Sequence, residues 1–234
     1  MKKIITIYFF ILTGLNLFGQ DHCHTKFDIK NKETILNKIK LIEERNNLKA
    51  NYSNHYTVRI FCHIVRRTNG TEGITNTEVL NAIQKLQQAF NPHNICFSLK
   101  GIDNIDDDTH YTNYNFSSLI QQNKNDDAID LYFLGHNGPV NGGRAEGFVF
   151  PTLSSQYTYT NDALVIGGKI QGDNCIGTHV LSHEMGHVLG LFHTFMTAIC
   201  PEFVNGSNCN SCGDIVCDTE ASPGISFSNN LNSN

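Results

Sequence analysis

Residues 183–193 read HEMGHVLGLFH, and this stretch decides how the rest of the chain has to be organised. His183 and His187 are four positions apart, so on a helix both side chains project from the same face. Gly190 can adopt backbone conformations that other residues resist, which allows the helix to end and the chain to turn sharply. That turn is expected to bring His193 back towards the two histidines of the helix.

Three histidines that converge in this way are typical ligands of a zinc ion, and they leave a fourth position open for water, as in catalytic zinc sites. Glu184 directly follows the first histidine and is expected to act as the general base that takes a proton from this water. The alternative is a chance pattern of surface histidines on an amphipathic helix. A chance pattern does not explain why Gly190 and His193 complete the longer motif. We therefore predict a zinc site formed by His183, His187 and His193.

The residues around the motif also favour a helix, which we expect to run from Thr178 to Leu189. The helix carries an apolar stripe that can bury its back while the ligands face a cleft. The stripe consists of Val180, Leu181, Val188 and Leu189. Thr178 is the expected N-cap residue.

The composition describes a globular chain. Its 234 residues are enough for one well-buried domain with small additions, and 40% of them are hydrophobic while 17% are charged. The net charge is -5 and no basic stripe is present, so a nucleic-acid partner is not expected.

The first 19 residues have the pattern of a secretory signal peptide. Lys2 and Lys3 precede an apolar stretch over residues 4–12, and cleavage is expected after Gly19. The alternative is a membrane anchor, for which the stretch is short. The mature protein is therefore predicted to be secreted, with no stable association with a membrane.

Residues 20–55 form a candidate pro-segment, because they precede the first strong strand pattern of the chain. Within them, residues 31–49 have the pattern of an amphipathic helix, and the alternative is an ordinary N-terminal helix of the domain. Cys23 is a candidate latency ligand, since a thiolate could occupy the open position of the zinc until the segment is removed. Pairing of Cys23 in a disulfide is the other interpretation.

The eight cysteines of the chain fit export to an oxidising compartment. Four of them lie within residues 200–217. Cys209 and Cys212 have the C-x-x-C spacing of a zinc site, but a second such pair is missing, so disulfides are favoured. The sequence does not fix how the cysteines pair.

Residues 56–225 are predicted to form the folded domain, followed by a disordered tail over residues 226–234. Thr75 and Glu78 form the capping box of a helix that ends at Asn91-Pro92. Strands alternate with helices in the first half, which predicts an α+β domain with a mixed sheet packed against helices. The expected strands are residues 56–66, 95–99, 129–134, 144–150 and 163–166.

Residues 183–193 resemble the zinc signature of the metzincin metallopeptidases. Thr194-Phe195 and the segment GDIVCDT at residues 213–219 are similar to the pappalysin and cytophagalysin branch, which comprises ulilysin-like secreted enzymes; Glu220 replaces the proline usual there. The resemblance implies a zincin domain, in which a twisted mixed sheet packs on the active-site helix, and it makes residues 56–225 the catalytic domain.

The same resemblance implies a secreted zinc endopeptidase that hydrolyses peptide bonds with Glu184 as general base. A protein or peptide substrate would pair with an edge strand, for which residues 144–150 are the candidate. The family often binds Ca²⁺ after the zinc motif, and Asp214, Asp218 and Thr219 offer suitable oxygen ligands. The alternative is that these three side chains satisfy a disulfide-rich loop.

One feature of the family has no counterpart in the sequence. Metzincins carry a methionine turn well after the third histidine, whereas Met196, the last methionine of this chain, follows His193 too closely. The C-terminal subdomain is therefore expected to be truncated. This leaves open an alternative function, in which the chain is a catalytically silent zinc-binding protein that serves as a binding module.

Overall fold

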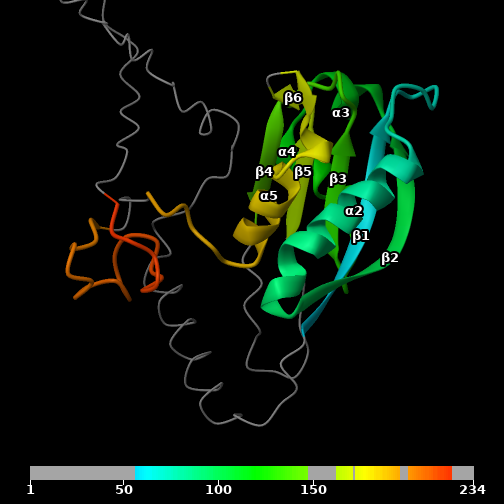
Figure 1. The fold of residues 1–234 in the computed structure, drawn as a ribbon. Helices are drawn as coiled ribbons and strands as arrows, with labels where there is room; N and C mark the ends of the chain where they lie inside the picture. The colour runs from blue at the N-terminus through cyan, green and yellow to red at the C-terminus, as the bar shows by residue number, and fades with distance from the viewer. Residues whose placement is uncertain (1–55, 147–161, 171, 196–199, 223–234) are drawn as a thin grey trace, which may run out of the picture.

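The computed structural model describes residues 56–146, 162–170, 172–195 and 200–222 (Figure 1). The predicted signal peptide, the candidate pro-segment with Cys23 and the predicted tail lie outside these residues. In chain order the elements are β1 (Tyr56–Arg66), α2 (Asn76–Phe90), η3 (Asn91–His93), β2 (Ile95–Asp106), α3 (Asp108–Thr112), α4 (Phe116–Leu119), β3 (Ile129–Leu134), β4 (Gly142–Glu146), β5 (Ala163–Gly167), β6 (Lys169–Ile170), β7 (Asp173–Asn174), η4 (Cys175–Gly177) and α5 (Val180–Val188).

The centre of the domain is a five-stranded sheet in the order β2-β1-β3-β5-β4. The pairs β1–β2, β1–β3 and β3–β5 are parallel, whereas β4 pairs with β5 in the antiparallel direction. β4 therefore forms one edge of a mixed sheet. The prediction of an α+β domain, in which a mixed sheet packs on the motif helix, is confirmed.

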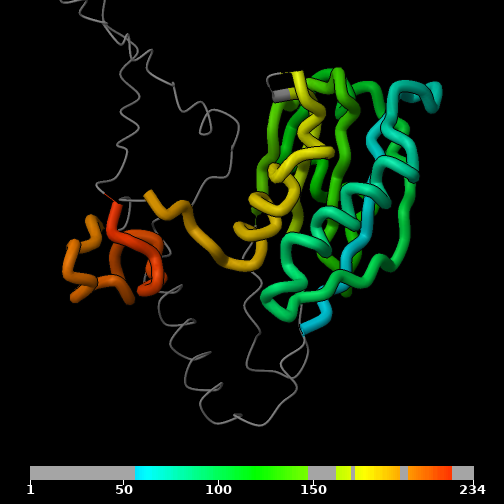
Figure 2. Tube along the Cα trace, in the orientation of Figure 1, coloured from blue at the N-terminus to red at the C-terminus, as the bar shows by residue number. Residues whose placement is uncertain are grey.

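The two faces of the sheet bury separate apolar clusters. On one face, α2 and α5 lie side by side across the strands (Figures 1 and 2) and pack on alternate strand residues such as Ile60, Leu131 and Ile166. On the other face, α3 and α4 cover the intervening residues, including Tyr132 and Val165. The alternation follows from the two-residue period of a strand, which directs successive side chains to opposite faces.

Local sequence explains where the long helix α2 begins. Thr75 is the N-cap, and its side chain accepts a hydrogen bond from the Glu78 backbone while the Glu78 carboxylate accepts one from the Thr75 N–H at 2.8 Å. This is the predicted capping box. At the other end, η3 contains Pro92 and continues directly from α2.

Strand β5 ends one residue later than predicted, at Gly167, and two other strands differ more from the predictions. β2 continues past Leu99 to Asp106. The polar residues in its second half hide the strand pattern in the sequence, but a strand at the sheet edge tolerates them, and Asp106 pairs with Arg66 at 2.7 Å. The predicted edge strand over residues 144–150 is present as β4 but begins at Gly142, and residues 147–150 lie outside the described part.

The motif helix starts later than predicted, and the expected N-cap was wrong. α5 runs over Val180–Val188 and His179 occupies the N-cap position. The Thr178 hydroxyl donates to the Cys175 carbonyl at 2.8 Å and accepts from the Val180 N–H at 3.3 Å, so this residue links the preceding turn η4 to the helix. Among the described residues, no helix has both the length and the apolar character needed to cross a membrane.

Candidate metal centre

The turn after α5 brings the three histidines of the motif together. His183 and His187 project from the helix, which ends at a Schellman-type turn: the Gly190 N–H donates to the His187 carbonyl at 3.0 Å, and the Leu191 N–H donates to the Gly186 carbonyl at 2.9 Å. Gly190 has a φ of +100°, which glycine adopts without strain. The predicted role of this glycine as the point of reversal is thus present in the structure.

The Nε2 atoms of the three histidines lie 3.1, 3.1 and 3.2 Å from one another. Three nitrogens that each bind one tetrahedral zinc ion at about 2.0–2.1 Å are about 3.3 Å apart, so the observed spacing fits such an ion. Of the residues that the structure describes, these are the only three His, Cys, Asp or Glu side chains grouped closely enough to hold a metal.

The surroundings keep the histidines in the form that binds metals. Burial lowers the pKa of His187 and of His193 to about 4, and burial also lowers the pKa of His183. A neutral imidazole offers a lone pair, whereas an imidazolium does not.

One hydrogen bond further fixes the orientation of His187. Its Nδ1 lies 2.7 Å from the Leu191 carbonyl, which can only accept, so Nδ1 carries the proton and Nε2 presents its lone pair to the other two histidines. The ring of His193 stacks on Phe195 with 4.8 Å between centroids. The Leu191 carbonyl therefore orients His187, and a stacked aromatic ring supports His193, before any metal binds.

Glu184 lies on the same helix and its side chain is fully buried. It packs against Gly143 of β4, where a Cβ atom would come within 2.4 Å of the Glu184 Cγ atom. The sequence analysis did not identify Gly143 as part of the site. The signal available was the Gly142-Gly143 pair at the start of the edge strand, since adjacent glycines within a strand often mark a close approach of another group.

The cysteine-rich loop after the motif contains two disulfides, Cys200–Cys212 and Cys209–Cys217. The prediction of disulfides is confirmed here, and the C-x-x-C pair is divided between the two bridges. Residues 200–222 contain turns but no helix or strand.

The three calcium candidates are only partly brought together in this loop. The Asp214 carboxylate is buried and accepts hydrogen bonds from the Val216 N–H at 3.0 Å and from the Thr219 hydroxyl at 2.9 Å. Asp218 forms no metal-binding group with other acidic residues of the described part. The bonding of Asp214 and Thr219 is therefore the kind expected if these side chains stabilise the loop.

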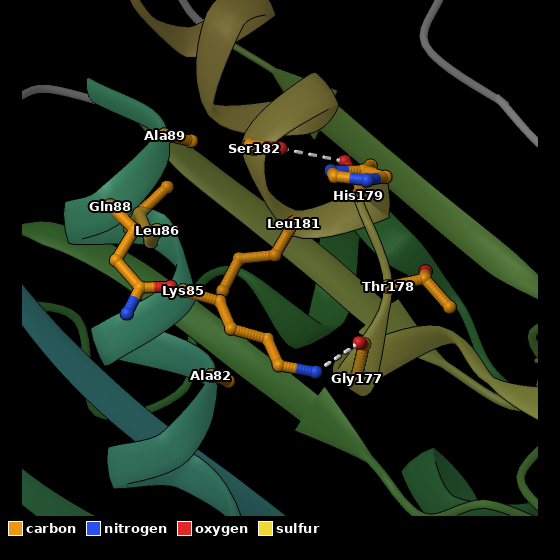
Figure 3. A pocket seen from close by; sticks show the side chains of 10 residues that line it. All are labelled: Ala82, Lys85, Leu86, Gln88, Ala89, Gly177, Thr178, His179, Leu181 and Ser182. Atoms are coloured by element: carbon orange, nitrogen blue, oxygen red, sulfur yellow. Dashed lines mark hydrogen bonds between the residues drawn. The ribbon is translucent and has the colours of Figure 1, made fainter. Parts of the chain in front are cut away.

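A separate hollow of about 420 Å³ lies between α2 and the beginning of α5 (Figure 3). Its walls include Leu86, Ala89 and Leu181, and at its rim the Lys85 ammonium donates to the Gly177 carbonyl at 2.6 Å. Neither Glu184 nor the three histidines line it, so this hollow is distinct from the metal centre.

Comparisons with known proteins agree with the chemistry of the centre. The model of metallo-peptidase family M12 (reprolysin type) matches residues 31–226. Extracellular metalloproteases of Podospora anserina and Neurospora crassa are 31% and 29% identical to the chain, each over 70% of its length. The chain spans about half the length of these relatives, 56% of each.

Two further similarities are more distant. An extracellular metalloprotease of Colletotrichum graminicola is 26% identical over 86% of this chain and 72% of its own length. Among solved structures, metalloproteinase-II from Bacteroides fragilis aligns with a TM-score of 0.41 and 12% identity, over 76% of this chain and 52% of that one.

Proposed function

Because the chain belongs to metallo-peptidase family M12, we propose that it is a secreted zinc-dependent endopeptidase in which His183, His187 and His193 hold the ion and Glu184 is the general base. The observation that carries the proposal is the convergence of three imidazoles whose Nε2 atoms lie within 3.2 Å of one another, next to a buried carboxylate. The extracellular metalloproteases among its relatives support the same activity and the same location.

Each residue of the centre has a separate task in this proposal. When bound, zinc supplies a Lewis acid that acidifies water and polarises a carbonyl oxygen. Glu184 accepts the proton of the attacking water on a carboxylate oxygen and later delivers it to the nitrogen of the leaving amine. Its burial excludes bulk water from this proton transfer, while the Leu191 carbonyl keeps His187 in the tautomer that binds metal.

A protein or peptide is the substrate class that the architecture favours. Among the described residues, strand β4 lies at the sheet edge and is paired only with β5, and it packs directly against Glu184 through Gly143. An extended peptide can add to such an edge through backbone hydrogen bonds. The peptide bond to be cleaved would then lie across the metal centre.

Three finer assignments stay proposals. The segment GDIVCDT at residues 213–219 supports placement in the pappalysin and cytophagalysin branch. A calcium ion held by Asp214, Asp218 and Thr219 rests on the same resemblance and on their oxygen ligands, and a latency role for Cys23 rests on the chemistry of its thiolate.

The test compares the wild-type chain with Glu184→Gln on a denatured protein substrate such as gelatin, with and without a chelator. We expect chelator-sensitive cleavage by the wild type, and a fall in kcat of about 10²–10⁴-fold in the variant, with one equivalent of zinc still bound. Cleavage by Glu184→Gln at the wild-type rate would contradict the assignment of the base. Zinc binding without cleavage by either protein would instead support the alternative of a catalytically silent binding module.

A further inference from the structure

Gly143 approaches Glu184 more closely than any residue with a side chain could. A Cβ atom built on Gly143 would lie 2.4 Å from Cγ, 2.8 Å from Oε1 and 2.9 Å from Cδ of Glu184. Each distance is shorter than real Cβ atoms show, and all three nearest atoms belong to this one side chain. The space that glycine leaves open is therefore filled by the carboxylate side chain.

The backbone conformation of Gly143 does not itself require glycine. Gly142 has a φ of +136°, but Gly143 is not among the glycines with a positive φ. Any residue could adopt the backbone angles of Gly143. The requirement for a missing side chain comes from the contact across to helix α5.

Neither side of the contact can move away freely. Gly143 is buried and pairs with Ile166 of β5, and its neighbour Ala145 packs in the apolar cluster beneath α5. On the helix, Glu184 is followed by the fully buried Met185. Because the closest contact is to Cγ, near the root of the side chain, an added methyl group would force a different rotamer and move the whole carboxylate.

We propose that Gly143 is the positioning residue of Glu184: its missing side chain sets where the carboxylate lies relative to the three histidines. The proposal rests on the proposed function, since it assigns the position of the general base. A misplacement of about 1 Å can lower a rate by about 10²-fold even when binding is intact. A side chain at position 143 is therefore expected to reduce turnover and not metal binding.

The experiment combines Gly143→Ala with Glu184→Ala, which removes all three atoms that the new methyl group would meet. In the wild-type background, we expect Gly143→Ala to lower kcat by about 10²-fold, with KM within about two-fold and zinc stoichiometry unchanged. It is also expected to lower the urea midpoint of the metal-free protein. In the Glu184→Ala background, the same change is expected to leave the midpoint unaltered.

Gly177→Ala is the matched control. It lies just before α5, and its Cβ would meet only the Lys85 ammonium, at 3.9 Å. This variant is expected to keep the kcat and midpoint of the wild type. If Gly143→Ala alone does not fold, folding of the double variant supports the proposal, and failure of both overturns it.

Two other outcomes also overturn the proposal: a Gly143→Ala protein with wild-type kcat, or an equal loss of stability in both backgrounds. An inactive wild type that binds zinc would refute the proposed function. In that case the stability comparison still decides whether Gly143 accommodates Glu184, so the two failures can be told apart.

Discussion

Replacing Gly190 by alanine tests the turn that joins helix α5 to the third histidine. Gly190 has a φ of +100°, beyond the left-handed region that other residues occasionally adopt. Holding alanine in such a conformation costs of order 1–3 kcal/mol. The strain can be relieved only by opening the turn, which weakens the hydrogen bonds from Gly190 to His187 at 3.0 Å and from Leu191 to Gly186 at 2.9 Å. We therefore expect the metal-free protein to lose about 2 kcal/mol of unfolding free energy.

The same change is expected to weaken zinc binding. Opening the turn moves the Leu191 carbonyl away from His187 Nδ1, now 2.7 Å distant, and shifts the backbone that carries His193. Loss of a hydrogen bond that orients a metal ligand typically lowers metal affinity by about 10–100-fold. That factor corresponds to about 1.4–2.7 kcal/mol of binding free energy.

The assay is a competition titration of zinc against a chromophoric chelator at pH 7, together with urea unfolding of the metal-free protein. Gly172→Ala is the control, because Gly172 has a similar φ of +92° and no atom lies within 4 Å of its added Cβ. The control is expected to show a comparable cost in stability without a change in zinc affinity. Equal zinc affinities for Gly190→Ala and wild type, or an equal loss of zinc affinity in Gly190→Ala and Gly172→Ala, would refute the argument that this turn orients the ligands.

Two further predictions concern stability. The Thr75 backbone N–H and then His136 lower the pKa of Glu78 to about 2, well below its value in an unfolded chain. Since 39% of the Glu78 side chain is exposed, screening leaves about 1 kcal/mol, present above about pH 4.5 and lost as the pH falls towards 2. Glu78→Gln should therefore lower the urea midpoint of the metal-free protein by more at pH 7 than at pH 2, and a difference of equal size at both pH values would exclude the charge as its cause. His63 is fully buried, and its ring nitrogens lie 2.6 Å from Asp103 and 3.0 Å from the buried Asp130, so His63→Phe should cost about 3–5 kcal/mol. Adding Asp130→Asn should recover part of this loss; no recovery would show that the Asp130 carboxylate, which keeps two hydrogen bonds from Asn125, is not the cause.

The features that the sequence predicts well are those whose partners are near in the chain. The capping box of Thr75 and Glu78 spans four residues, and the three histidines that the turn brings together lie within eleven. Strand β3 is buried along its whole length, so its apolar run identifies it without knowledge of its neighbours. In each case one local rule of spacing is enough to decide the structure.

The features that were missed depend on distant contacts. Helices α3 and α4 are short and begin at the side-chain caps Asp107 and Asn115, and buried residues such as Phe116 hold them against the sheet. No periodicity can develop over a single helical turn. The start of α5 was misplaced for a related reason, because the Thr178 hydroxyl also donates back to Cys175 of the preceding turn and His179 takes the N-cap position.

The candidate site depends both on local spacing and on a distant contact. Its motif can therefore predict metal binding more directly than it can predict activity. The histidines are placed by one helix and one turn, so the motif alone is sufficient to predict metal binding. The carboxylate of Glu184 is placed by that helix together with Gly143, which comes from a strand far earlier in the chain. A chain with the same motif but a side chain at position 143 is therefore expected to bind zinc and yet hydrolyse peptides poorly. On this proposal, metal binding and turnover are separable in this fold, and the contact between Gly143 and Glu184 affects turnover and not metal binding.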